Sequence, residues 1–170
     1  MKIAVIGYSG SGKSTLAASL ARKYFLPLMH LDRVHFLPGW KEREIEDEVR
    51  IVGEFLDSNS SWVIDGNYNK LHFDRRMQEA DRIILMCFNR FSSLYRVLRR
   101  YHRYKGRARS SVADGCEEKI DREFLFWVLY KGRTGKRRAV YRSVRRKYSE
   151  KVTVINNQRA LDEFYKENIG

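Results

Sequence analysis

Cysteine and proline are both scarce in this chain, with two of each among 170 residues. Cys87 and Cys116 lie in different segments without a paired spacing, so neither a disulfide scaffold nor a four-ligand zinc site is expected, and a reducing, cytoplasmic setting fits best. There is no Pro-rich linker, low-complexity segment or internal repeat. We therefore expect a single domain over residues 1–170, large enough to bury a hydrophobic core.

Long hydrophobic runs are missing as well. No stretch approaches the length of a membrane span, and the apolar run at 2–6 is of strand length rather than that of a leader peptide. No membrane partner is therefore expected. Hydrophobic residues still make up 43% of the chain and aromatic residues 13%, which argues against disorder.

Basic residues are concentrated in one part of the chain. Residues 90–147 contain 19 Lys or Arg against 5 Asp or Glu, a net charge of +14, whereas the whole chain carries +13. A segment of this kind has to meet something anionic, either the phosphates of a nucleotide or a nucleic-acid backbone. The charge alone leaves both interpretations open.

Short apolar runs alternate with helical patterns along the chain. Val and Ile dominate most of these runs, as in strands that are covered on both faces. The alternation predicts βαβ units and an α/β fold with a five-stranded parallel sheet. The expected strands are 2–6, 28–31, 62–64, 82–88 and 152–155.

Two connections between these runs are longer than a single crossover helix needs, and we expect them to form mobile flaps over one end of the sheet. The connection over 32–61 contains LPGW and then an amphipathic helix, and the one over 89–151 carries the positive charge. Within the second, 117–131 predicts a helix that packs on the core, and 136–149 predicts a basic surface helix.

Each expected strand is followed by a small or polar residue. In open α/β sheets, ligands bind in the crevice beyond the carboxyl ends of the strands. The residues at these ends are therefore candidates for a ligand site. They are Gly7, Asp32, Asp65, Asn89 and Asn156.

The segment GYSGSGKST matches G-x-x-x-x-G-K-S between an expected strand and an expected helix. Its glycines let successive backbone N–H groups face one centre, which makes a phosphate nest at a helix N-terminus. Lys13 adds a charge for the β- and γ-phosphates, and the Ser14 hydroxyl is placed to bind Mg²⁺. The nucleotide-binding candidates are Gly7, Ser9, Gly10, Ser11, Gly12, Lys13, Ser14 and Thr15.

Two aspartates are candidates for the rest of the site. Asp65 in WVIDGNYNK is placed to orient the Mg²⁺ shell as a Walker-B-like carboxylate, with an ordinary turn aspartate as the alternative. Asp32 is placed to hold an acceptor, to act as a base on its hydroxyl or to support Mg²⁺, with a helix cap as the alternative. His30 and His35 lack the spacing of a helical metal pair, so no metal other than Mg²⁺ is expected.

Arginines recur on one face of the helix expected after residue 90, and a closing flap can deliver such groups to a moving phosphoryl group. Arg96, Arg99 and Arg100 lie on this face. A solvated basic face is the alternative for any one of them. Asn156 is a candidate for contact with adenine, and a turn into the last helix is the alternative.

Together these motifs resemble the P-loop kinases of the adenylate kinase and shikimate kinase group. More narrowly, the chain looks like the small, adenylate-kinase-related bacterial proteins called DNA topology modulation proteins. The matching pieces are GYSGSGKST, HLD with the following PGW, WVIDGNY, and RVLRRY leading into GCEEK. The resemblance spans nearly the whole chain.

The resemblance implies a three-layer α/β/α P-loop fold with an acceptor-binding segment at 33–60 and an Arg-rich lid at about 104–135. It also implies ATP as donor and Mg²⁺ as cofactor, with Arg96, Arg99 and Arg100 as phosphate-binding candidates. The lid lacks the Cys-rich zinc knuckle found in part of the group.

One departure from the adenylate kinase pattern concerns the acceptor. Those enzymes follow the third-strand aspartate with Gly-Phe-Pro-Arg, whereas here Asp65 is followed by Gly66, Asn67 and Tyr68. The arginine that would hold AMP is absent from this position. An acceptor other than AMP is therefore expected.

Two functions fit these observations. The favoured one is a kinase that passes the γ-phosphate of Mg-ATP to a small acceptor, such as a metabolite, nucleoside or nucleotide. The alternative is a nucleic-acid-binding NTPase that influences DNA topology through residues 90–147. A GTPase is disfavoured, because no N-K-x-D follows the fourth strand. The catalytic candidates are Lys13, Asp32, Arg96 and Arg100, and the acceptor-binding candidates are Asp32, Trp40, Asp65, Gly66, Asn67 and Tyr68.

Overall fold

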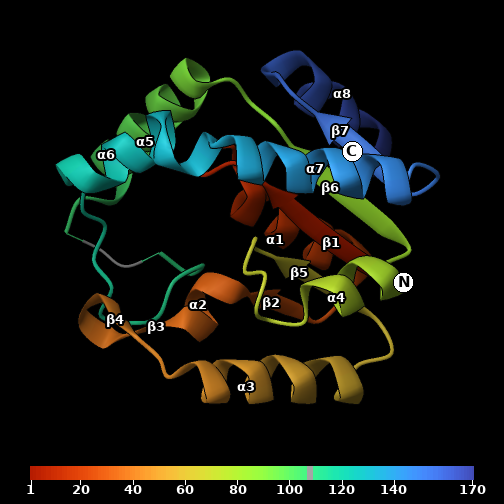
Figure 1. The fold of residues 1–170 in the computed structure, drawn as a ribbon. Helices are drawn as coiled ribbons and strands as arrows, with labels where there is room; N and C mark the ends of the chain where they lie inside the picture. Colours follow the sequence, from red (N-terminus) through yellow and green to blue (C-terminus); the bar gives the residue numbers. More distant parts are fainter. Residues whose placement is uncertain (107–108) are drawn as a thin grey trace.

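A computed structural model describes residues 1–106 and 109–170 (Figure 1). Residues 107 and 108, which fall inside the expected lid, lie outside the described residues. The strands are β1 (Lys2–Gly7), β2 (Leu28–His30), β3 (Phe36–Leu37), β4 (Lys41–Glu42), β5 (Trp62–Asp65), β6 (Arg82–Met86) and β7 (Val152–Ile155). The helices are α1 (Lys13–Tyr24), α2 (Leu31–His35), α3 (Ile45–Ser58), α4 (Phe73–Glu79), α5 (Arg90–Tyr104), α6 (Arg122–Leu129), α7 (Gly135–Lys147) and α8 (Gln158–Asn168), with short 3₁₀ turns η1 (Pro38–Trp40) and η2 (Lys131–Arg133).

Five strands form one parallel sheet in the order β2-β5-β1-β6-β7, which confirms the fold expected from the apolar runs. β1 is central, and Ile3, Ala4, Val5 and Ile6 are fully buried in it. Burial on both faces explains why the strand reads as a continuous apolar run. The carboxyl ends of β1, β2 and β5 meet at one edge, where Val5 and His30 each pair with Asp65.

Helices cover both faces of the sheet, so the protein has three layers (Figure 1). On one face, α1 and α8 bury Leu16, Leu20, Leu161 and Phe164 against the sheet. On the other face, α3, α4 and α7 do the same with Val52, Leu56, Met77, Tyr141 and Val144. No helix within the described residues is long and apolar enough to cross a membrane.

Three details of the fold differ from the sequence-based prediction. The helix expected over 117–131 begins only at Arg122, where Asp121 caps it by accepting a hydrogen bond from the N–H of Phe124, and Glu118 pairs instead with Lys105 in an isolated bridge. That helix is also not a core helix, since only Val128 is buried and Phe126 is 49% exposed. The small antiparallel pair of β3 and β4 was not expected.

Candidate functional site

The loop between β1 and α1 follows a path that depends on glycine. Gly7 has φ of 136°, and a Cβ there would lie 2.1 Å from the carbonyl oxygen of Met86 on β6. Gly10 has φ of 76°, and a Cβ there would lie 2.7 Å from the carbonyl oxygen of Ser93 on α5. Any larger residue would force this loop away from its neighbours. α1 begins at Lys13, so the loop leads into the positive end of a helix dipole.

Lys13 is the cationic side chain of this loop. Its Nζ donates a hydrogen bond of 3.0 Å to the carbonyl oxygen of Tyr8, so the side chain folds back across the loop. Burial lowers the pKa of the Lys13 ammonium, and the carboxylates of Asp65 and Asp32 oppose that shift. Both aspartates singled out from the sequence therefore lie within electrostatic range of Lys13.

Asp65 connects the loop to the neighbouring strand. The Ser14 hydroxyl donates to Asp65 Oδ2 over 2.8 Å, and His30 Nδ1 bonds the other carboxylate oxygen. Asp65 is 5% exposed and His30 is 8% exposed, so the chain holds this carboxylate in one orientation. The Ser14 hydroxyl and the Asp65 carboxylate are thus in contact, as the Walker-B-like interpretation of Asp65 requires. That Asp65 orients a Mg²⁺ ion remains a prediction.

A hydroxyl and a carboxylate in contact fit Mg²⁺, which prefers oxygen ligands and keeps several of its sites for water and phosphate. In residues 1–106 and 109–170 no group of three or more His, Cys, Asp or Glu side chains could hold a metal by itself. A metal here would therefore depend on phosphate oxygens for much of its coordination. Ser14 and Asp65 are the side chains that would hold it.

The loop after β5 fixes two further predicted residues. The Asn67 side chain bonds the backbone of Gly7 in both directions, accepting from its N–H over 2.9 Å and donating to its carbonyl over 2.5 Å. The Tyr68 hydroxyl donates to Asp32 Oδ1 over 2.8 Å. Asn67 thus acts on the start of the phosphate loop, and Tyr68 leaves Asp32 Oδ2 with no hydrogen bond from any described residue.

Arg76 on α4 gives this loop its shape, and sequence reasoning missed it. The guanidinium is fully buried and donates to the carbonyl oxygens of Leu71, Gly66 and Tyr68. Burial lowers its pKa to about 10, which Asp65 partly opposes. Three main-chain carbonyls replace the water that a buried charge has lost, so the loop that carries Asn67 is held from within.

The expected acceptor segment makes few contacts with the phosphate loop. His35 Nδ1 bonds the buried Glu48 of α3 over 2.8 Å, and the ring of His35 lies 4.8 Å from that of Tyr68. Trp40 turns elsewhere, since its Nε1 donates to the carbonyl oxygen of Glu117 over 2.9 Å. Trp40 therefore links the acceptor segment to the start of the expected lid, and its predicted contact with an acceptor remains untested.

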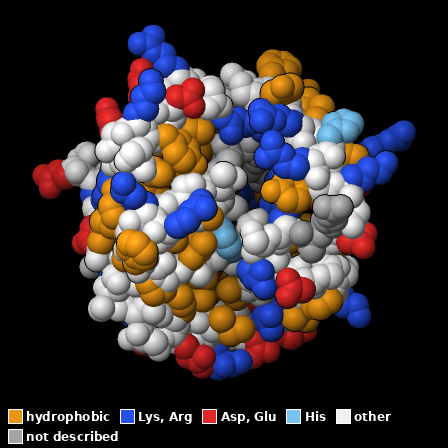
Figure 2. Space-filling model, turned by 180° about the vertical axis from the view of Figure 1, so that it is seen from behind, with side chains coloured by type: hydrophobic (Ala, Val, Ile, Leu, Met, Phe, Trp, Pro, Cys, Tyr) orange, Lys and Arg blue, Asp and Glu red, His pale blue; other side chains and the backbone are white. Residues whose placement is uncertain are grey.

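Two arginines, Arg100 of α5 and Arg109 of the expected lid, are held by one buried carboxylate. Glu118, with a side chain 2% exposed, accepts from Arg100 over 2.6 Å and from Arg109 over 2.5 Å. Both guanidinium groups act on Lys13 and lower its pKa, and Asp32 acts in turn on Arg100. Asp32, Arg100 and Arg109 are therefore within electrostatic range of the phosphate loop. Figure 2 shows a hollow in the molecular surface that Lys and Arg side chains border.

Of the remaining candidates on α5 and after the last strand, only Arg96 contacts the phosphate loop. Arg96 reaches the phosphate loop, with Nη1 3.4 Å from the carbonyl oxygen of Ser11 and its guanidinium 4.3 Å from the ring of Phe88. Arg99 is exposed, and among the described residues it makes no hydrogen bond or ion pair. Asn156 is also exposed and accepts a hydrogen bond from Asn157, which caps α8.

Two residues near the loop were missed altogether. Trp127 on α6 donates through Nε1 to the Ser9 hydroxyl over 3.2 Å. Arg133 lies over the ring of Tyr8 at 4.1 Å and donates to the carbonyl oxygen of Phe88 and to the Ser93 hydroxyl. A tryptophan and an arginine in the lid segment were visible in the sequence, but no spacing rule connects them to a loop more than 100 residues away.

A cavity adjoins Asn67. Its volume is about 290 Å³, and it lies between the β5–α4 loop and the start of α7. Asn67 and Asn69 supply amides, and Lys136 and Arg137 supply positive charge. Phe73, Val140 and Tyr141 add apolar surface, so this lining suits a small molecule that combines a negative charge with an apolar part.

The fold of this chain is similar to that of several solved structures. A gluconokinase from Sinorhizobium meliloti matches with a TM-score of 0.54 and 18% identity over 99% of this chain and 89% of that one. A protein from Eubacterium ventriosum matches with a TM-score of 0.52 and 18% identity over 98% of both chains. A protein from Thermus thermophilus matches with a TM-score of 0.52 and 17% identity over 100% and 98%.

At such low identity these matches establish the fold alone, an α/β arrangement around a five-stranded parallel sheet. No known family's sequence profile matches the chain, and no curated protein matches it in sequence. The narrower resemblance to DNA topology modulation proteins is therefore not confirmed. The function has to be argued from the site.

Proposed function

We propose that this protein is an ATP-dependent phosphotransferase that passes the γ-phosphate of Mg-ATP to a hydroxyl group of a small acceptor. The observation that carries the proposal is the set of groups around Lys13. Asp32 from the acceptor side, Arg100 of α5 and Arg109 from the lid all act on this one ammonium. A site that only bound a nucleotide would not need acceptor-side carboxylate and lid charges in the same space.

The groups around Lys13 suggest a division of labour. Backbone N–H groups of residues 7–14 and Lys13 hold the transferred phosphate, and Ser14 and Asp65 would hold a Mg²⁺ ion, which would supply positive charge to the phosphates. Asp32 Oδ2, left open by the Tyr68 hydrogen bond to Oδ1, takes the proton of the acceptor hydroxyl. The acceptor oxygen then bonds to the γ-phosphorus as the bond to the ADP oxygen breaks, while Arg100 and Arg109 spread the charge.

The cavity beside Asn67 suggests which acceptors to try first. Lys136 and Arg137 favour an anionic group, and Asn67 and Asn69 favour hydroxyl groups. Hydroxyl-bearing acids and phosphorylated alcohols meet both conditions. These classes therefore belong at the start of an acceptor screen.

The nucleic-acid alternative loses support from where the basic side chains point. Arg100 and Arg109 share the single carboxylate of Glu118, and Arg133 is turned inward onto Tyr8. Three of the 19 basic side chains that the sequence offered to a phosphate backbone are thus used inside the protein. A gel-shift titration across salt concentrations measures what remains, because backbone binding shows a steep salt slope.

The decisive test is ADP release with and without each candidate acceptor. We expect one acceptor class to raise ADP release well above the hydrolysis background, and Lys13→Ala to lower that rate by at least about 100-fold. Lys166→Ala on α8, which removes the same charge from an exposed position, serves as the matched control and should leave the rate unchanged. Full activity in Lys13→Ala with any acceptor would refute the proposal.

A further inference from the structure

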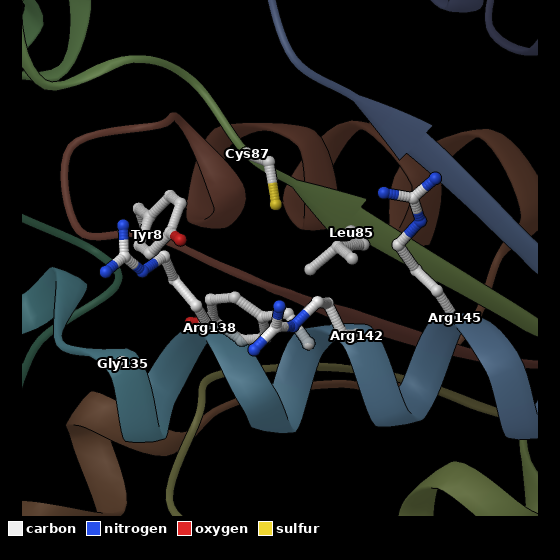
Figure 3. A pocket seen from close by; sticks show the side chains of 8 residues that line it. Tyr8, Leu85, Cys87, Gly135, Arg138, Arg142 and Arg145 are labelled. Carbon is white, nitrogen blue, oxygen red and sulfur yellow. The ribbon is translucent and has the colours of Figure 1, made fainter.

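A second cavity lies between α7 and the end of β6, and none of the residues expected to bind nucleotide or acceptor lines it (Figure 3). Its volume is about 330 Å³. One wall consists of Leu85 in β6 and Cys87 just after the end of this strand. Tyr141 of α7 adds an aromatic surface. Tyr8 closes the cavity toward the phosphate loop.

Three arginines of α7 form the other side of this cavity. Arg138, Arg142 and Arg145 follow one another at intervals of four and three residues, so they share one face of the helix. Figure 3 shows Arg138 and Arg145 rising from α7 on either side of Cys87 and Leu85. Burial raises the pKa of the Cys87 thiol, and Arg145 opposes that shift, as expected if the two lie close together.

These arginines have no counter-charge in the part of the chain that the structure describes. No Asp or Glu lines the cavity, and none of the three forms an ion pair with a described carboxylate. All three side chains are exposed, so water and salt weaken their mutual repulsion without abolishing it. An anion that bridged them would relieve this repulsion, and the planar guanidinium fork matches the oxygens of a phosphate group.

From this lining we propose that the cavity binds a small phosphate monoester, separate from the nucleotide of the phosphate loop. The phosphate group contacts Arg138 and Arg145, and its organic part lies against Leu85, Cys87 and Tyr141. The volume suits a molecule with one ring rather than a nucleoside triphosphate. The proposal does not depend on the phosphotransferase function.

Tyr8 couples this cavity to the phosphate loop. Its ring packs edge-on against Tyr141 at 5.2 Å, and its carbonyl oxygen accepts the hydrogen bond from Lys13. One residue therefore touches the occupant of the cavity and holds the cation of the nucleotide site. Binding at the two sites should be coupled, and by linkage the effect is reciprocal.

Phenyl phosphate is a suitable probe, because it combines the phosphate with one aromatic ring. Calorimetric titration should give one binding site in the natural protein and in Lys13→Ala, where the phosphate loop is impaired. Arg138→Ala combined with Arg145→Ala should weaken this binding at least about tenfold, since each arginine loses charge-assisted hydrogen bonds. Arg146→Ala, which removes the same charge from the same helix but does not line the cavity, should change it little. Inorganic phosphate and phenol test each half of the probe alone.

Cys87 reports on the location independently of any ligand. The rate of its alkylation by anionic iodoacetate is divided by the rate with neutral iodoacetamide. Both reagents react with the same thiolate, so this ratio is independent of the thiol pKa and reports the local electrostatic potential. We expect this ratio to exceed that of free cysteine and to fall toward it in the double arginine variant. Phenyl phosphate should protect Cys87 in peptide maps, where the fully buried Cys116 gives a separate peptide.

Three results would overturn the proposal. They are equal binding in the natural protein and the double variant, an iodoacetate ratio like that of free cysteine, and displacement of phenyl phosphate by a DNA duplex with a steep salt slope. The last would assign the arginines to a nucleic-acid backbone. An ATP affinity that phenyl phosphate leaves unchanged would refute the coupling through Tyr8.

Discussion

Ser14 and Asp65 share a hydrogen bond of 2.8 Å between Oγ and Oδ2, although 51 residues separate them in the chain. The parallel pairing of β1 with β5 produces this meeting, because it brings the start of α1 and the end of β5 to the same edge. His30, from the next strand of the sheet, bonds the second oxygen of Asp65. Ser14 and His30 thus hold the Asp65 carboxylate beside the loop that would bind the nucleotide phosphates.

Asp65→Asn should separate charge from shape at this position. The amide keeps the size of the side chain but lacks the negative charge that attracts Mg²⁺. We expect the Mg²⁺ concentration for half-maximal ADP release to rise at least about tenfold. Asp47→Asn, at an exposed position on α3, removes only a surface ion pair worth about 0–1 kcal/mol and should leave the Mg²⁺ response intact. An unchanged response in Asp65→Asn would show that this carboxylate does not serve the metal.

Arg76→Lys should destabilise the protein, although it keeps the charge. Lysine cannot reach the carbonyl oxygens of Leu71, Gly66 and Tyr68 with the geometry of a guanidinium, so at least one buried carbonyl loses its donor. We expect the free energy of unfolding to fall by about 2–4 kcal/mol in urea titrations. Arg75→Lys, at the neighbouring and only half-buried position, should cost less than about 1 kcal/mol. Equal losses in both variants would contradict the role given to Arg76.

The Tyr68 hydroxyl should make stability fall at alkaline pH. Burial, and then the charge of Asp32, raise the pKa of this phenol well above its ordinary value of 10.0. Above pH 10 the unfolded chain therefore releases this proton while the folded protein keeps it, and unfolding becomes more favourable.

Tyr68→Phe tests this pH dependence. Near pH 8 it should cost about 1 kcal/mol for the lost hydrogen bond to Asp32. The difference from the natural protein should shrink as pH rises above 10, because only the natural protein loses stability through this group. A difference between Tyr68→Phe and the natural protein that stays constant from pH 8 to above pH 10 would refute the argument.

The sheet and the phosphate loop could be predicted because both leave local signals. β1 spans Lys2–Gly7, the predicted strand with one further residue, since burial on both faces demands an unbroken apolar run. The glycine spacing before Lys13 likewise reports a local backbone path. The β3–β4 pair escaped prediction because two residues per strand are too few to show alternation.

Contacts that depend on tertiary structure left no such signal. The partners of Arg76 are main-chain carbonyls, which are the same chemical group at every position in the sequence. Glu118 lay in a stretch that resembled a helix on the core, and only its two arginine partners reveal its role. The helical face of arginines after residue 90 could be predicted, but which of them turns toward the loop depends on how α5 packs.

Arg96 and Arg99 therefore give a direct comparison within that face. Arg96 contacts the carbonyl oxygen of Ser11 and stacks on Phe88, whereas Arg99 is exposed. Arg96→Ala should raise the dissociation constant for ATP by about tenfold, as the loss of a charged hydrogen-bonding group beside phosphate predicts. Arg99→Ala should change it less than threefold in the same fluorescence titration. The reverse order would mean that α5 rotates when nucleotide binds.

Glu118→Gln should loosen the lid from its own interior. The carboxylate is 2% exposed and holds Arg100 and Arg109, so the amide leaves two neighbouring guanidinium groups short of a counter-charge. Breaking a buried ion pair from one side typically costs about 3–5 kcal/mol, and here the cost should appear mainly as local opening of the lid. We expect hydrogen exchange to accelerate over 109–129 while β1 and β6 stay protected. The KM for ATP should rise and kcat should fall, because both arginines lose the carboxylate that orients them.

Glu117→Gln changes the adjacent, exposed residue in the same way and should leave exchange and kinetics unaltered. Uniform acceleration of exchange throughout the chain would instead identify Glu118 as a determinant of global stability with no particular bearing on the lid.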